Sequence, residues 1–159
     1  MDLPSKLNVR QATVPDMGAV LALARELADA VADPDPGSDA TPIIDALFSG
    51  TPWGECLVAE YDGEIVGFVL FCRHFEAHTG QRSLWIADLA VAAERQKAGI
   101  GRALLRAVES RAAILGANAV SFEVWKQNKQ ALAFYNRLGA TFLDDRYLML
   151  MAEQSPART

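Results

Sequence analysis

The sequence has few of the residues that build metal centres and disulfide frameworks, and it has no long apolar run. Its 159 residues include two cysteines, Cys56 and Cys72, and two histidines, His74 and His78. Two cysteines give neither metal-ligand spacing nor a disulfide framework, so we interpret both as buried, reduced thiols within strands, and we expect the histidines in a solvent-facing loop. No apolar run approaches the ~18 residues that cross a bilayer, and residues 1–6 lack the basic and apolar regions of a signal peptide. We therefore expect a cytoplasmic protein with no bound metal and no membrane segment.

Clustered positive charge is also absent. The formal net charge is −5 at pH 7, and binding to nucleic acid needs grouped Lys and Arg side chains that neutralise phosphates. The composition therefore argues against a nucleic-acid partner and slightly favours a cationic one. With 51% hydrophobic residues and a length typical of one domain, the chain is predicted to fold as a single domain over residues 1–159, with an ordered core at 6–152 and a flexible tail at 153–159.

Hydrophobic periodicity predicts strands and helices that alternate along the chain. Asp62-Gly63 lies between two apolar runs and predicts a tight hairpin, because both central residues of the favoured turn need positive φ. Segment 33–39 is rich in proline, glycine and aspartate, which predicts an exposed loop. The expected strands span residues 7–12, 56–59, 65–71, 84–91, 119–124, 141–143 and 146–152. The first expected helix starts near Thr13, and the others span residues 43–48, 100–115 and 129–138. This order predicts an α/β (α+β) fold with a mixed, partly parallel sheet flanked by helices.

A short glycine-containing loop joins the strand that ends in Asp88-Leu89-Ala90-Val91 to a strongly periodic helix. The loop reads Gln96-Lys97-Ala98-Gly99-Ile100-Gly101-Arg102. The first N–H groups of a helix have no intrahelical partner and the helix dipole is positive there, so this loop is suited to hold a pyrophosphate. Glycine pairs at helix starts also serve packing alone. The loop matches neither the phosphate loop of nucleotide hydrolases nor the dinucleotide fingerprint, so a ligand other than ATP or NAD is expected.

A second motif lies downstream, where Val124-Trp125-Lys126-Gln127-Asn128 leads into residues 131–140. Together the two motifs resemble the GNAT superfamily of acyl-CoA-dependent N-acetyltransferases. Gln96, Gly99 and Gly101 meet the family pattern Arg/Gln-x-x-Gly-x-Gly/Ala. The later family positions are met by Asn128, Ala131, Phe134-Tyr135 and Leu138-Gly139-Ala140. The resemblance extends from about Val9 to Met151 and implies a sheet splayed between its two central strands.

The resemblance also implies how acetyl-CoA is held. The pantetheine arm would pair with the backbone of Leu89, Ala90 and Val91 as an added strand does. Main-chain N–H groups from Gln96 through Arg102 would hold the pyrophosphate, with charge added by Lys97 and Arg102. In the commonest family form, glycine is frequent at the position of Lys97 and a basic residue at that of Ala98. The expected cofactor residues are Leu89, Ala90, Val91, Gln96, Lys97, Ala98, Gly99, Ile100, Gly101, Arg102, Asn128, Ala131 and Tyr135.

Acetyl transfer to an amine needs a neutral amine, stabilisation of an oxyanion and a proton for the departing thiolate. Tyr135 stands where the family has the tyrosine that protonates the thiolate; the alternative is an aromatic packing residue. Asn128 would orient the cofactor, cap the helix, or both. Asp88 and Glu123, on the two central strands, are the candidate bases, acting directly or through water. Their alternatives are a structural acceptor at a strand irregularity and a solvent-facing strand residue.

The expected acceptor is the primary amine of a small molecule such as a diamine or an amino-acid-like compound. The chain looks most like the diamine N-acetyltransferase branch, although Ala87 replaces the glutamate that this branch has before its strand acid. Asp88, Glu123 and Asp145, with Asp144 beside it, are candidate contacts for a substrate ammonium group, and an acidic turn is the ordinary alternative for the last two. A protein N-terminus or lysine as acceptor, and an acyl-CoA sensor without catalysis, are the other functions considered. The family often forms homodimers, so a homodimer is expected.

Overall fold

The computed structural model describes residues 6–143 of the chain. It divides into two compact units, residues 1–125 and 126–159, and each is described by itself. The expected strand at residues 146–152, the expected tail and Asp144 and Asp145 lie outside the described residues.

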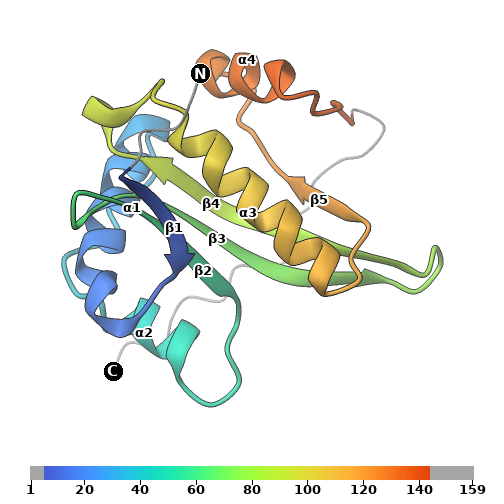
Figure 1. The fold of residues 1–159 in the computed structure, drawn as a ribbon, viewed down its shortest axis with the longest axis horizontal. Coiled ribbons are helices and arrows are strands. Elements are labelled where there is room, and N and C mark those ends of the chain that lie inside the picture. Colours follow the sequence, from blue (N-terminus) through green and yellow to red (C-terminus); the bar gives the residue numbers. More distant parts are fainter. Residues whose placement is uncertain (1–5, 144–159) are drawn as a thin grey trace. The chain divides into compact units, whose positions relative to one another are not determined.

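The first unit contains a five-stranded sheet in the order β1-β2-β3-β4-β5 (Figure 1). Neighbouring strands are antiparallel except β4 and β5, which are parallel. The predicted mixed, partly parallel sheet is therefore confirmed. The strands are β1 (Leu7–Gln11), β2 (Glu55–Tyr61), β3 (Glu64–Glu76), β4 (Gln81–Val91) and β5 (Ala119–Phe122).

The hairpin between β2 and β3 turns at the predicted dipeptide. Asp62 has φ of 51° and Gly63 has φ of 83°, which is the backbone that a two-residue hairpin with right-handed strand twist requires. Asp62 also forms an ion pair with Lys6 at 2.9 Å. The local sequence thus determines the register with which the two strands start.

The helices agree with the predicted pattern, with shifts at their ends. The helix expected to start near Thr13 divides into a 3₁₀ turn and a following α-helix, and the second helix starts at Thr41. The helical elements of the first unit are η1 (Val14–Asp16), α1 (Met17–Val31), α2 (Thr41–Phe48), η2 (Ala93–Arg95) and α3 (Ile100–Ile114). The second unit contains α4 (Lys129–Arg137).

Three local predictions were wrong. β3 continues to Glu76, so His74 lies in a strand and only His78 lies in the following turn. Cys72 is half-buried, whereas Cys56 is buried as expected. Residues 141–143 have no strand structure. The polar run at the end of β3 has no apolar alternation, because this part of the strand has little core to cover.

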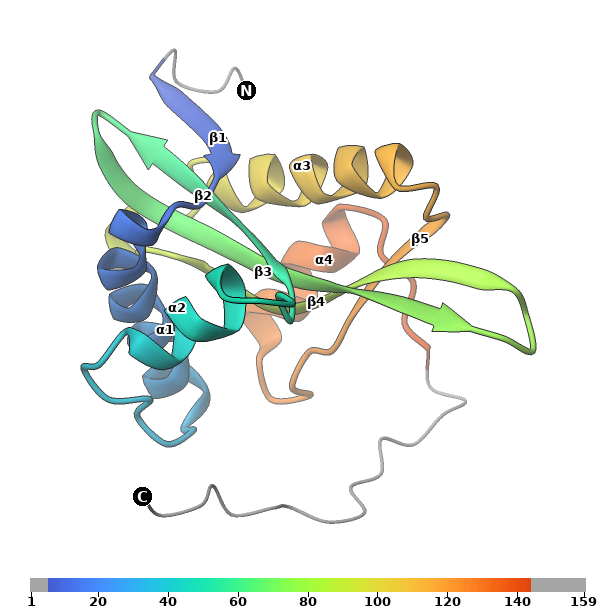
Figure 2. The same cartoon turned by 90° about the horizontal axis from the view of Figure 1, so that it is seen from below.

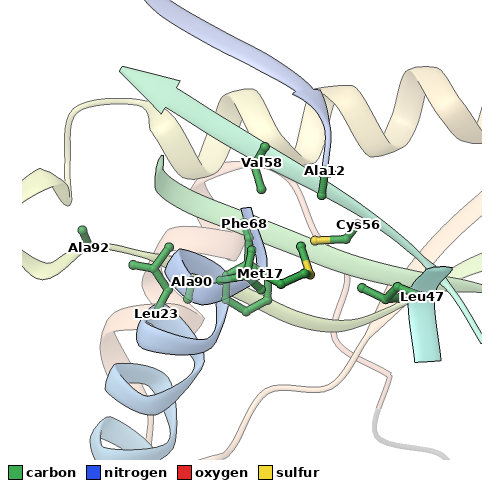
Figure 3. Packing of buried hydrophobic residues seen from close by; sticks show 10 residues of the cluster. Ala12, Met17, Leu23, Leu47, Cys56, Val58, Phe68, Ala90 and Ala92 are labelled. Carbon is green, nitrogen blue, oxygen red and sulfur yellow. The ribbon is translucent and has the colours of Figure 1, made fainter. Parts of the chain in front are cut away.

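The sheet carries an apolar cluster on each face. On one face Met17 and Val20 of α1 pack with Phe68 of β3, and this cluster also takes in Leu47 of α2 (Figure 3). On the other face Leu104 and Val108 of α3 pack on β3 and β4. Figure 2 shows α3 on one side of the sheet and α1 and α2 on the other. Because both faces are covered, β3 and β4 are held rigidly in the middle of the unit.

Candidate functional site

Strands β4 and β5 are hydrogen-bonded over only part of their length. Ser83 to Ile86 pair with Ala119 to Phe122, and β4 then continues to Val91 without β5 as its neighbour. On its other side β4 stays paired with β3 as far as Val91. Within the described residues, the stretch Ala87–Val91 therefore has one backbone edge without a strand partner. This is the splay between central strands that the sequence predicted, and the predicted pantetheine contacts Leu89, Ala90 and Val91 lie on it.

A β-bulge at Ala87 sets the direction of Asp88. Ile86 pairs with Phe71 and Asp88 pairs with Leu70, so Ala87 is the extra residue. Bulges re-aim side chains near functional sites. Here the bulge places Asp88 in the same cross-strand row as Leu70 and Cys56, on the sheet face that α1 and α2 cover.

The surroundings of Asp88 change its acidity. Its side chain is accessible to solvent, yet many protein atoms surround the carboxyl group, and this partial desolvation raises the pKa of Asp88. The negative charge of Asp88 in turn adds to burial and to Asp16 in raising the pKa of the Cys56 thiol to about 12. A carboxylate with a raised pKa is a better proton acceptor at neutral pH than an ordinary aspartate.

The loop after β4 is anchored by backbone and side-chain contacts. The Ala92 N–H donates to the Val66 carbonyl at 2.9 Å, and Gln96 Nε2 donates to the Val91 carbonyl at 3.3 Å. Gln96 thus ties the predicted pyrophosphate loop back to the end of β4. The sequence motif singled out Gln96, but this contact could not be foreseen from it.

Two left-handed residues shape this loop. Lys97 has φ of 64° and Gly99, the N-cap of α3, has φ of 84°. Left-handed residues in a turn direct successive N–H groups toward one point, which makes an anion-binding concavity. The positive φ at Lys97 also explains why the family has glycine frequently at this position, since a side chain costs conformational energy there.

No side chain caps the start of α3. Gly99 has no side-chain oxygen, and its φ and ψ of 84° and 0° place it outside the usual N-cap conformation. The first N–H groups of α3, on Ile100, Gly101 and Arg102, are those that an intrahelical bond cannot satisfy. Lys97 and Arg102 are both exposed beside them. This arrangement is suited to bind a phosphate group.

A glycine on β3 fixes where α3 starts. A Cβ at Gly67 would lie 3.3 Å from side-chain atoms of both Ile100 and Leu104 and 3.0 Å from the Ala90 carbonyl oxygen. Gly67 pairs with Val91, so the helix start and the end of β4 meet at this residue. Gly67 was not among the predicted site residues, although an isolated glycine in a strand pattern often signals such a close approach.

The second unit carries the other predicted residues. Asn128 Oδ1 accepts a hydrogen bond from the Ala131 N–H at 3.0 Å and caps α4, as predicted. Tyr135 and Phe134 meet edge to face with ring centroids 5.1 Å apart. Burial raises the pKa of Tyr135, so its phenol stays protonated at neutral pH and is able to donate a proton.

The remaining candidates are placed less favourably. Glu123 directly follows β5 and its side chain is exposed. Asp145 lies outside the described residues. Within residues 6–143, no group of three or more His, Cys, Asp or Glu side chains is arranged to hold a metal ion. None of the helices described is both long and apolar enough to cross a membrane.

The sequence matches the model of the acetyltransferase (GNAT) family over residues 21–140. The chain is 31% identical over 147 residues to a thialysine N-epsilon-acetyltransferase of Bos taurus, covering 86% of this chain and 85% of that protein. It is 32% identical over 79 residues to an L-ornithine N5-acetyltransferase of Arabidopsis thaliana, covering 50% of this chain and 35% of that protein. The chain therefore belongs to the GNAT acetyltransferase family, and it is an acetyltransferase.

Solved structures agree on the fold. A possible acetyltransferase from Clostridium difficile 630 superposes with a TM-score of 0.79 at 20% identity, over 95% of this chain and 99% of that one. An aminoglycoside acetyltransferase from an uncultured soil metagenomic sample superposes with a TM-score of 0.78 at 19% identity, over 96% of this chain and 100% of that one. At this identity the likeness extends to the fold alone.

Proposed function

We propose that the protein transfers an acetyl group from acetyl-CoA to the primary amine of a small molecule, by direct attack in a complex that holds both substrates. The observation that carries this proposal is the continuity of two features in the first unit. The partnerless edge of β4 at Ala87–Val91 leads through the Gln96 loop directly into the uncapped start of α3. An extended amide-containing arm and a pyrophosphate are the two ligand parts that these features fit.

The pantetheine arm binds as an added strand. Its amides exchange hydrogen bonds with the free edge of β4 at Leu89 and with the Val91 N–H, and Ala90 lies between them. The pyrophosphate then lies at Lys97, Ala98 and Gly99 and the first turn of α3. Gln96 holds this loop against Val91. Ile100, Gly101 and Arg102 supply the first-turn amides. For Asn128 and Ala131 of the second unit, the cofactor contacts implied by the family resemblance stay a prediction.

The chemistry needs one proton acceptor and one proton donor. As the amine nitrogen attacks the thioester carbonyl, a C–N bond forms and the C–S bond then breaks. Before the attack, the substrate ammonium gives a proton to Asp88, directly or through water, and so becomes the neutral amine; the raised pKa of Asp88 suits it to this role. Glu123 is the second candidate for the same role. Tyr135, protonated at neutral pH, donates the proton that the departing thiolate takes up.

The acceptor is a small amine, most simply the terminal amine of an amino-acid-like compound or a diamine. The names of the two relatives, a thialysine N-epsilon- and an L-ornithine N5-acetyltransferase, support this class. Asp88 is available to pair with a substrate ammonium, and we assign Glu123 and Asp145 to the same group of substrate contacts. Ala87 lies at the position of a branch glutamate, so a substrate other than a polyamine is favoured. A homodimer in the cytoplasm is part of the same proposal, and light scattering tests the dimer.

The direct test is acetyl-CoA consumption by the purified protein, followed by thiol release, against diamines, amino acids, aminoglycosides and short peptides, with acetyl-CoA affinity measured in parallel. Turnover on diamines or amino acids supports the proposal. Turnover on peptides alone would replace the acceptor class by protein termini or lysines. Tight acetyl-CoA binding with no turnover on any amine would favour a sensor, and no binding would overturn the assignment of the loop at Gln96.

A further inference from the structure

Beyond the other end of β4, the hairpin formed by β3 and β4 extends past the other strands as a two-stranded arm (Figure 2). A pocket of about 340 Å³ lies at the base of this arm. This volume is at the lower end of the range for small-molecule sites. Its lining residues are Arg73, His74, Phe75, Arg82, Ser83, Leu84, Leu115 and Ala117.

The strand register places charged and apolar side chains in this pocket in a definite pattern. Arg73 pairs with Leu84, and Phe75 pairs with Arg82. Positions two apart on a strand share a face, so these four residues form a patch with the arginines on one diagonal and the apolar side chains on the other. The backbone positions of diagonal neighbours are about 7–8 Å apart, which long side chains can span, so both arginine side chains are within reach of one small carboxylate.

The described residues leave most of this positive charge uncompensated, although Arg73 has a long ion pair with Glu55. Glu55 gives both carboxylate oxygens to Arg111, at 2.8 and 3.1 Å, and its distance to Arg73 is 3.9 Å. The Arg73 side chain is 72% exposed. Within the described part of the chain, no carboxylate forms an ion pair with Arg82. In a protein whose net charge is −5, this is a local concentration of positive charge.

The position of Arg82 is fixed by its neighbours. Its carbonyl accepts from the Asn118 N–H at 3.0 Å, which holds the strand against the start of β5. Its Nη1 atom lies 3.8 Å from where a Cβ at Gly116 would be, so the guanidinium lies against the turn after α3. Phe75, 63% exposed, provides apolar surface beside it, whereas Leu84 is buried in the core that α3 covers.

We propose that this pocket binds a small carboxylate with an aryl or branched-alkyl body. The carboxylate lies between Arg73 and Arg82, and its apolar body lies against Phe75 and Leu115. Val91 lies seven positions after Leu84 on β4, which is about 23 Å along an extended strand. The site is therefore separate from the proposed cofactor loop and does not depend on acetyl transfer.

The test is an NMR titration of the ¹⁵N-labelled full chain with three probes: sodium benzoate, the uncharged analogue benzyl alcohol and inorganic phosphate. Benzoate is expected to shift the amides of residues 73–75, 82–84 and 115–117, with both other probes at least ~10-fold weaker. Because the readout locates the binding, it separates this site from the cofactor loop.

Substitutions decide the role of the arginines. Arg82→Gln and Arg73→Gln should each weaken benzoate binding by ~10-fold. Arg106→Gln, which removes the same charge from an exposed position on α3, should change it by less than ~2-fold. The proposal is overturned if benzoate leaves these amides unmoved at ~50 mM, if phosphate or benzyl alcohol binds there as well as benzoate, or if Arg106→Gln weakens binding as much as Arg82→Gln.

Discussion

Two helix starts in the first unit differ in how their backbone groups are satisfied. At η1, which leads into α1, the Asp16 carboxylate accepts from the Thr13 N–H at 2.7 Å and from the Thr13 hydroxyl at 2.9 Å. Arg10 adds two hydrogen bonds to the same carboxylate and one to Glu60. At α3, Gly99 offers no cap, and positive φ values precede the helix.

The difference shows which end is structural. At the start of η1, the Thr13 N–H, the Thr13 hydroxyl and the Asp16 N–H all have partners within the protein. The start at Gly99 keeps its donors and lies beside a strand edge that also has free backbone groups. This bare helix start, next to a strand edge, is where we propose that acetyl-CoA, the co-substrate of the GNAT family, binds.

The largest expected effect is on kcat and comes from a third helix, α4. Asn128 caps the start of this helix, and Tyr135 further along it is the proposed proton donor. Tyr135→Phe should lower kcat by at least ~100-fold, because the departing thiolate loses its proton donor. The acetyl-CoA dissociation constant should change by less than ~3-fold, which calorimetry checks. Phe134→Leu on the same helix is the matched control for packing. Equal kcat for Tyr135→Phe and the wild type would assign Tyr135 to packing alone.

Removing the Asp16 charge at the start of η1 should lower the free energy of unfolding without changing the affinity for acetyl-CoA. Asp16 is 8% exposed, and Asp16→Asn removes the charge that Arg10 contacts. We expect a loss of about 2–3 kcal/mol in the free energy of unfolding with unchanged acetyl-CoA affinity. Arg10 holds the pKa of Asp16 below its ordinary value. Its contribution is therefore present above the unfolded pKa near 4 and is lost as the pH falls below it.

Urea unfolding at pH 7 and at pH 3 measures this. The difference between wild type and Asp16→Asn should shrink at pH 3. A loss of acetyl-CoA affinity in a variant that is still folded would contradict the structural role of Asp16.

A side chain placed at Gly99, at the start of α3, should change the affinity for acetyl-CoA more than it changes the free energy of unfolding. Gly99→Asp adds a carboxylate beside the pyrophosphate, whereas Gly99→Asn adds an amide of the same shape. Both residues tolerate positive φ better than most. We expect Gly99→Asp to bind acetyl-CoA ~30-fold more weakly than Gly99→Asn by calorimetry, through charge repulsion in a desolvated site. Equal affinities would show that no phosphate lies near Gly99.

The pH profile of kcat/KM tests Asp88, the proposed base on β4 beside the free strand edge. A base must be unprotonated, so kcat/KM should fall as the pH falls through the raised pKa of Asp88. Asp88→Asn should lower kcat/KM by ~10-fold or more and remove this acid limb. Glu123→Gln is the comparison for the second candidate base. If Asp88→Asn keeps the limb and Glu123→Gln loses it, the base is Glu123.

The smallest expected effect is at Lys97. Lys97→Gly removes the conformational cost of a side chain at φ of 64°, but it also raises the conformational entropy of the unfolded chain. Because these two effects oppose each other, the free energy of unfolding should change by less than ~1 kcal/mol. Acetyl-CoA affinity should fall by ~2- to 3-fold with the lost charge. Lys97→Gln loses the same charge and keeps a side chain on the left-handed backbone. If the glutamine variant binds as tightly as wild type, the charge of Lys97 has no part in binding.

Much of the fold follows from local sequence. Asp62-Gly63 determined a hairpin, Asn128 a helix cap, and the glycine loop the start of α3, because each rests on backbone preferences of a few residues. The bulge at Ala87 and the positive φ of Lys97 could not be predicted. Both depend on how β4 pairs with β3 and how α3 packs at Gly67, which are contacts between segments far apart in the sequence.

The division of the first helix has a similar cause. Asp16 stays out of the regular helix because its carboxylate is held by Arg10 and Thr13, and the partner on β1 is not visible in the local pattern. The arm of β3 beyond Phe71 was missed because its polar side chains lack apolar alternation. For the site, the motif identified the loop, while the interaction of Gln96 with Val91 needed the structure.

The comparison of the two helix starts can be tested in a single experiment, a ¹⁵N NMR titration of the protein with CoA. The account predicts the largest amide shifts at Lys97–Arg102 and at Leu89–Val91, with Thr13–Asp16 unmoved. Saturable binding that leaves Lys97–Arg102 unmoved, or that shifts Thr13–Asp16 as strongly, would contradict the assignment of the bare helix start to the cofactor.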